Sequence, residues 1–135
     1  GYNYRMTDIS AAIGREQLKK LSKFNSRRRE IAEIYNSELS DLVVTPKNRR
    51  GHVFHQYTIR TEKRDQLKEF LFDRKINTGI YYPSLLFNYP SMEAYKSICP
   101  NAEILIKEVL SLPVHPALTD SDVFEVISSI KEFFE

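Results

Sequence analysis

Residues 7–39 read TDISAAIGREQLKKLSKFNSRRREIAEIYNSEL, and this stretch predicts one long helix. Thr7 is a favourable N-cap residue, and Asp8 falls in the first turn, where the helix dipole favours negative charge. Apolar residues recur at steps of three and four along one face: Ile9, Ala12, Ile13, Leu21, Phe24, Ile31, Ile34 and Tyr35. At about 1.5 Å per residue, this helix is longer than a domain of this size needs internally. We therefore expect it to bridge two bodies or to pack on a neighbour along part of its length.

The residues after this helix predict a small α+β domain over 42–135, so that 1–135 form a single domain. We expect strands at 43–45, 52–60 and 80–82, and helices at 64–75 and 101–109. Residues 84–100 are expected to be irregular and residues 110–116 extended. Thr119 and Asp122 match a capping box before a last amphipathic helix. The order predicts a small, mostly antiparallel sheet with helices packed on one face, preceded by the long N-terminal helix.

Composition argues against several classes of protein. The formal net charge of +2 at pH 7 is too weak for a typical nucleic-acid-binding domain. No apolar run approaches the roughly 20 residues of a membrane span. The only cysteine, Cys99, cannot form an internal disulfide, which fits a cytoplasmic protein. We therefore expect neither a nucleic-acid nor a membrane partner.

Basic residues and histidines suggest no further site. The run 27–29 is three arginines, with Lys47, Arg49 and Arg50 later in the chain. No aromatic platform is interleaved with them, so we interpret them as a solvated face. His52 and His55 are three residues apart on an expected strand and should face opposite sides. They cannot easily share a metal ion, so no metal site is predicted.

Two groups of residues could bind a ligand. Asn3 and Arg5 precede the start of the long helix, and an amide and a guanidinium there suit phosphate or carboxylate. The alternative is an ordinary surface turn. Tyr81 and Tyr82 end an expected strand and should point to opposite sides, so one could be core while the other lines a site. Phe87 lies in the aromatic segment that follows, which could line a pocket or pack on a partner. Such chemistry in the opening residues suggests a piece of a larger protein.

Four stretches carry a resemblance to a known family. They are GYNYRMTDISAAIGREQLKKL (1–21), HVFHQYTIR (52–60), RDQLKEFLFDRKINTGIYYP (64–83) and EVLSLPVHPALTDSDVFEVISSIKEF (108–133). In this order and spacing they resemble the C-terminal half of the DegT/StrS sugar aminotransferases. Those fold-type-I enzymes use pyridoxal phosphate to aminate keto-sugars attached to a nucleotide.

The resemblance implies roles for the candidate residues. The residue matching Asn3 reaches across a homodimer to the cofactor phosphate of the neighbouring subunit, and Arg5 would lie close to the same site. Tyr81, Tyr82 and the segment with Phe87 would help to hold the nucleotide-sugar. The family more often has histidine where Tyr81 stands, so the details of that contact differ here.

The resemblance also implies what this stretch lacks. In the family, the Schiff-base lysine, the acidic partner of the pyridine nitrogen and the ring-stacking aromatic lie upstream, in a large cofactor-binding domain. We therefore expect no catalytic residue here, no cofactor bound to this chain alone and no transamination by it. The intact enzyme would use a nucleotide-linked keto-sugar and an amino donor, as a homo-oligomer. The alternatives are a non-catalytic nucleotide-sugar-binding module and a regulatory or DNA-binding protein.

Overall fold

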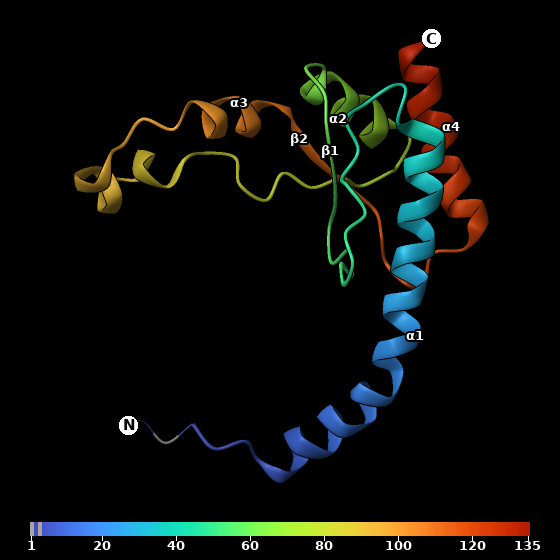
Figure 1. Cartoon of the computed structure of the whole chain (residues 1–135), viewed down its shortest axis with the longest axis vertical. Helices are drawn as coiled ribbons and strands as arrows, with labels where there is room; N and C mark the ends of the chain where they lie inside the picture. The colour runs from blue at the N-terminus through green and yellow to red at the C-terminus, as the bar shows by residue number, and fades with distance from the viewer. Residues whose placement is uncertain (1, 3) are drawn as a thin grey trace.

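Helix α1 (Asp8–Leu39) dominates the shape of the molecule. In the computed structural model, which describes residue 2 and residues 4–135, it runs out of the core and curves away from it (Figure 1). Thr7 is the N-cap, and its side chain accepts a hydrogen bond from the Ser10 N–H, as its position predicted. Only the second half of the helix is buried, through Ile31, Ala32, Tyr35 and Leu39. The expectation that α1 bridges two bodies or packs on a neighbour stays a prediction.

The sheet is smaller than the sequence suggests. Strands β1 (Tyr57–Arg60) and β2 (Val109–Leu112) pair antiparallel, with Tyr57 opposite Leu112 and Arg60 opposite Val109. The strands expected at 43–45 and 80–82 are reduced to isolated bridges, Val44 with Arg60 and Gly79 with Ser111. β2 lies in the stretch that was expected only to be extended.

The strand expected at 52–60 begins five residues late, and Phe54 gives the reason. Phe54 has a φ of 48°, which a β-strand cannot accommodate. Its N–H bonds to Nδ1 of His52 at 3.0 Å, and so is not available to a strand partner. The ring of Phe54 is fully buried, so a local turn places an aromatic residue in the core.

Helices α2 (Arg64–Asp73) and α4 (Asp120–Phe134) close the core against the sheet and the second half of α1. α2 ends two residues earlier than expected, because Lys75 takes a left-handed φ of 61°. The predicted capping box of α4 is present: Thr119 and Asp122 exchange side-chain and backbone hydrogen bonds. The buried apolar residues include Tyr35, Phe54, Tyr57, Ile59, Leu67, Leu71, Leu110, Val123 and Ile130.

A thin arm leaves the core after Gly79 and returns through helix α3 (Pro100–Glu108) (Figure 1). It contains two short 3₁₀ helices, Leu86–Asn88 and Pro90–Tyr95, within the stretch expected to be irregular. Side chains fix its returning end: Arg60 is bonded to Glu108 at 2.7 Å, and Arg64 donates to the Ile106 carbonyl at 3.1 Å. None of the helices within residues 2 and 4–135 meets the length and hydropathy that a transmembrane span requires.

Candidate functional site

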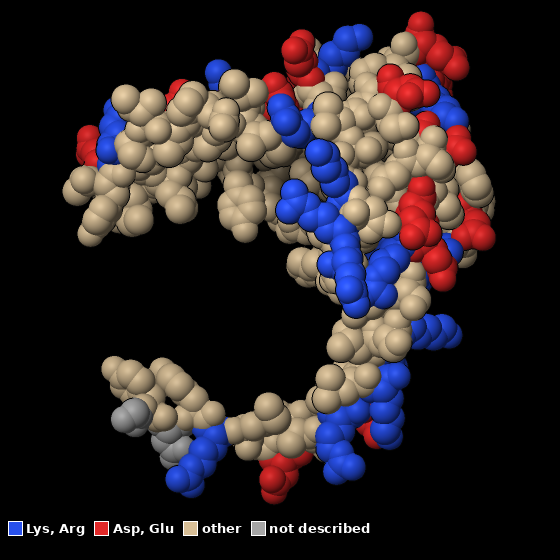
Figure 2. All heavy atoms as spheres, in the orientation of Figure 1, with Lys and Arg blue, Asp and Glu red and all other residues tan. Residues whose placement is uncertain are grey.

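The structure does not bring the predicted site residues together. Arg5 is exposed ahead of α1, and Asn3 lies outside the described residues. The start of α1 and the arm stand on opposite sides of a wide opening (Figures 1 and 2). Any site that uses both Arg5 and the tyrosines of the arm therefore needs a second body, or a second copy of the chain, between them.

Tyr81 and Tyr82 both face outward, so the expectation that one of them is core is wrong. Their side chains are 59% and 72% exposed. The residue that packs against the core is Ile80. The chain leaves the sheet after the single bridge at Gly79, so residues 80–82 form no strand whose side chains would alternate between two faces. Phe87 is half-buried within the arm.

A hollow of about 370 Å³ lies where four segments meet, and Tyr81 is on its rim. One side is the middle of α1, and the others are the approach to β1, the segment after α2 and the end of β2. It is lined by Arg28, His55, Gln56, Asn77, Thr78, Gly79, Tyr81, Ser111, Leu112, Pro113, Val114 and His115. Most of these side chains can donate or accept hydrogen bonds, and none is acidic.

The Tyr81 ring lies close to Gly79, in space that a larger residue at position 79 would occupy. A Cβ built on Gly79 would lie 2.8 Å from Cε2 and 3.2 Å from the hydroxyl of Tyr81. The backbone of Gly79 is fixed by reciprocal hydrogen bonds with Ser111, at 2.9 and 2.8 Å. Because no side chain stands there, the ring folds back onto the backbone, and its position depends on that glycine.

Two buried tyrosines support the walls of the hollow. The Tyr35 hydroxyl donates to the Pro113 carbonyl at 2.9 Å, and the Tyr57 hydroxyl donates to Asn36 Oδ1 at 2.7 Å. Burial raises the pKa of both phenols above the ordinary value, so both stay protonated donors at neutral pH. Tyr35 thereby ties α1 to the segment that follows β2.

The interpretation of residues 27–29 as a solvated face is wrong. Arg27 donates to the Leu118 carbonyl at 2.9 Å and to Asp120 at 2.7 Å, and its hydrogen bond with Asp120 raises its pKa. Arg29 donates to the His52 carbonyl at 3.0 Å. Arg28 is half-buried on the hollow. Helical periodicity could not reveal these roles, because the partners come from residues 23 to 93 positions away along the chain.

Charge is distributed unevenly over the molecule. Figure 2 shows Lys and Arg side chains gathered along the inner edge of the curve, over the loop between α1 and β1, whereas Asp and Glu gather on the outer side. That loop carries the exposed Lys47, Arg49 and Arg50. The inner edge is therefore the side that favours an anionic ligand.

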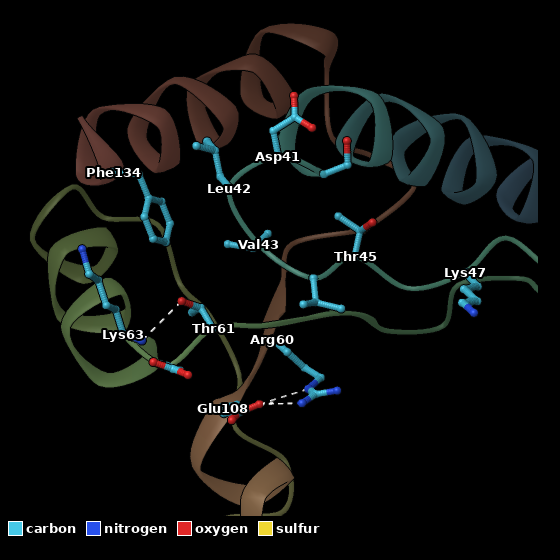
Figure 3. A pocket seen from close by; sticks show the side chains of 13 residues that line it. Asp41, Leu42, Val43, Thr45, Lys47, Arg60, Thr61, Lys63, Glu108 and Phe134 are labelled. Atoms are coloured by element: carbon cyan, nitrogen blue, oxygen red, sulfur yellow. Dashed lines mark hydrogen bonds and ion pairs between the residues drawn. The ribbon is translucent and has the colours of Figure 1, made fainter.

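A larger hollow, about 850 Å³, lies on another side of the core and has mixed charge (Figure 3). Two of its three cations have partners: Arg60 is bonded to Glu108, and Lys63 lies 5.5 Å from the Phe134 ring centroid, whereas Lys47 is exposed. Asp41 and Glu62 add negative charge to its lining. Nothing in this lining selects one ligand charge.

Among the described residues, no group of three or more His, Cys, Asp or Glu side chains could hold a metal ion. His52 is used structurally: its ring packs at a tilt against the Phe54 ring, with centroids 4.1 Å apart. His55 lines two adjoining hollows. Nine of the ten lysines are exposed, and the tenth, Lys131, pairs with Glu38 at 2.5 Å. None of them is in the apolar setting that activates a lysine amine for covalent chemistry.

Comparison with known proteins gives a consistent picture. The model of the DegT/DnrJ/EryC1/StrS aminotransferase family matches residues 1–131. A pleiotropic regulatory protein of Geobacillus stearothermophilus is 41% identical over 143 residues, covering 99% of this chain and 38% of that protein. GDP-perosamine synthase of Escherichia coli O157:H7 is 38% identical over 141 residues, covering 99% and 38%. The chain thus spans 38% of the length of these curated relatives.

Solved structures share the fold. DesV of S. venezuelae, in complex with a ketimine intermediate, aligns with a TM-score of 0.93 at 33% identity, over 100% of this chain and 38% of that one. NtdA of Bacillus subtilis, with bound cofactor PMP, aligns with a TM-score of 0.90 at 27% identity, over 99% and 34%. The predicted α+β fold with its leading long helix is therefore confirmed.

Proposed function

Because this chain belongs to the DegT/DnrJ/EryC1/StrS aminotransferase family, we propose that it is the C-terminal domain of a pyridoxal-phosphate-dependent nucleotide-sugar aminotransferase. The observation that carries the proposal is the continuous family match over residues 1–131, joined to the TM-score of 0.93 against DesV. In this role the domain completes a shared site in a homodimer and is not catalytic on its own. The single cysteine is consistent with a cytoplasmic location.

The residues of this chain fit only the phosphate end of the cofactor. Arg5 is exposed next to the N-terminus of α1, where backbone N–H groups and the helix dipole also favour an anion. Asn3 would donate its amide N–H to the phosphate of the neighbouring subunit's cofactor, and Arg5 would add positive charge beside it. When bound, the cofactor supplies the electron sink that lets an amino group pass between an amino acid and a keto-sugar. No lysine described here fits the reactive end, since all are exposed or ion-paired.

The arm is proposed to hold the nucleotide-linked sugar. Tyr81 and Tyr82 offer exposed rings and hydroxyls, and Phe87 stands on the 3₁₀ turn that follows. Aromatic faces suit a base or sugar ring, and hydroxyls suit sugar oxygens. The similarity to GDP-perosamine synthase supports a nucleotide-linked sugar as substrate, and the aminotransferase family implies an amino donor.

The first half of α1 supports the homodimer. Its apolar residues Ile9, Ile13, Leu18 and Leu21 are 75%, 58%, 68% and 48% exposed. Ile13 and Leu21 continue the apolar face that is buried at the other end of the helix, and Ile9 and Leu18 flank that face on opposite sides. An apolar stripe of this length on a water-facing helix marks a surface that another body covers.

The chain alone provides the test. We expect pyridoxal phosphate and borohydride to leave no stoichiometric adduct on any single lysine, and glutamate to yield no keto acid. A chain modified fully at one lysine, or one that transfers nitrogen by itself, would contradict the proposal. Serum albumin, which has reactive surface lysines, gives the background for non-specific modification.

The name of one relative suggests a second candidate function. The Geobacillus protein is named a pleiotropic regulatory protein, and the inner edge of this chain is basic. A regulator acting on DNA would bind duplex DNA with an affinity that falls steeply with salt. We expect no such binding above that of a basic protein of equal charge, measured by fluorescence anisotropy between low and physiological salt.

A further inference from the structure

Arg28 differs from the arginines on either side of it. Arg27 is engaged by Asp120, Glu30 and the Leu118 carbonyl, and Arg29 by the His52 carbonyl. Arg28 makes no hydrogen bond or ion pair with any residue that the structure describes, although it is half-buried on the hollow beside Tyr81. A partly desolvated guanidinium without a counter-charge is costly, and an anion that binds there recovers that cost.

The rest of the lining supplies donors and no competing carboxylate. His115 accepts the Ala117 N–H at its Nδ1, at 3.1 Å, so a neutral ring carries its proton on Nε2 and can donate. The side chains of His55, Gln56 and Asn77 have no hydrogen-bond partner among residues 2 and 4–135. The Tyr81 hydroxyl, held over Gly79, adds another donor. By contrast, the hollow of about 850 Å³ contains Asp41, Glu62 and Glu108.

We propose that this hollow is an oxyanion-binding site with Arg28 as its cation. Planar carboxylates and tetrahedral phosphates both present two adjacent oxygens. A guanidinium donates two parallel N–H hydrogen bonds to such a pair. Tyr35 fixes one wall through Pro113, and the Gly79–Ser111 bridge fixes another, so the site is built on the core rather than on the arm. The identity of the physiological anion depends on the proposed function. The nucleotide-linked sugar carries phosphates, and an amino-acid donor carries carboxylates.

Titration of the chain by NMR tests this site. Sodium diphosphate, inorganic phosphate and glutamate are added separately at constant ionic strength, and the ring signals of His55, His115 and Tyr81 are followed. We expect saturable shifts with at least one anion. The stronger anion identifies the source, diphosphate for the nucleotide and glutamate for the amino donor.

Arg28→Gln supplies the decisive variant, with Arg15→Gln as its matched control. Both remove one positive charge from α1, but Arg15 is exposed in the half of the helix away from the core. We expect Arg28→Gln to weaken binding about tenfold or more, because a hydrogen bond to a charged group contributes about 1.5–3 kcal/mol. Arg15→Gln should stay within about twofold of the unmodified chain, because a solvent-exposed charge contributes little. Thermal unfolding of both variants checks that each is folded.

The absence of saturable shifts with all three anions would overturn the proposal, as would equal weakening by the two variants. These measurements use no cofactor and no aminotransfer. A negative result therefore leaves the proposed aminotransferase role standing, and loss of that role leaves the anion site standing.

Discussion

Replacing Arg64 by methionine should loosen the returning end of the arm. Arg64 opens α2, and its side chain is only 11% exposed. Its guanidinium donates to the carbonyls of Ile106 at 3.1 Å and Val109 at 3.4 Å, which end α3 and begin β2. Those carbonyls have no helical partner, so Arg64 caps the C-terminus of α3 from outside. Methionine keeps the apolar stem and removes the donors.

The size of the effect follows from three terms. The bond to Ile106 is charge-assisted and contributes about 1.5–3 kcal/mol, and the longer bond adds little. Nε lies 2.6 Å from Asp65 Oδ1 but makes no aligned hydrogen bond, and Asp65 is 77% exposed, so this contact contributes little. Removing a positive charge from the N-terminus of α2 gains about 0.3–1 kcal/mol. The net loss in free energy of unfolding should be about 1–2 kcal/mol.

Urea unfolding and amide hydrogen exchange measure this loss. We expect the amides of residues 100–108 to exchange faster in Arg64→Met. The amides of α4 should stay protected from exchange until the whole chain unfolds. Lys68→Met, on the exposed face of the same helix, is the control and should change stability by less than about 0.5 kcal/mol. Equal stability of the two variants, with unchanged exchange in α3, would refute the role given to Arg64.

Further predictions concern the α4 cap, the Tyr81 ring and the exposed half of α1. The hydrogen bonds from the Thr119 side chain and backbone lower the pKa of Asp122, so its stabilisation is present above the unfolded value of 3.8 and is lost as pH falls through the folded pKa. The difference in melting temperature between wild type and Asp122→Asn should therefore shrink below that pH, and a constant difference down to pH 2 would contradict the cap. Gly79→Ala should move the Tyr81 ring signals in NMR spectra while leaving the melting temperature nearly unchanged, because the clash is with a ring and not with backbone; unshifted ring signals would show that Gly79 does not position it. Leu18→Glu with Leu21→Glu should reduce self-association in sedimentation velocity, since both side chains are exposed on α1; unchanged association would place the contact elsewhere.

The helices could be read from the sequence because their signals are local. Thr7, Thr119 and Asp122 act as caps within a few residues, and apolar periodicity marks the faces of α1 and α4. The strands were less predictable. Whether 43–45 and 80–82 extend into strands depends on partners far away in the chain, and Phe54 breaks its stretch through a positive φ that its residue type does not announce.

The candidate site was predictable only where chemistry is local. Arg5, Tyr81 and Tyr82 are exposed as a binding role requires, although nothing here brings them together, and Asn3 lies outside the described residues. Arg28 was missed because its neighbours in the hollow come from four separate segments. Three adjacent arginines on a helix point in different directions, about 100° apart. That geometry was the available signal that they could not all share one solvated face.

A chimera tests the central claim most directly. This chain replaces the matching 38% of GDP-perosamine synthase from Escherichia coli O157:H7, and cofactor content and aminotransfer are measured with and without Asn3→Ala. We expect the folded dimeric chimera to retain cofactor and to transfer nitrogen, and Asn3→Ala to weaken cofactor retention by about tenfold. A folded, dimeric chimera that neither holds cofactor nor transfers nitrogen would contradict the account. So would a chimera whose cofactor retention is unchanged by Asn3→Ala.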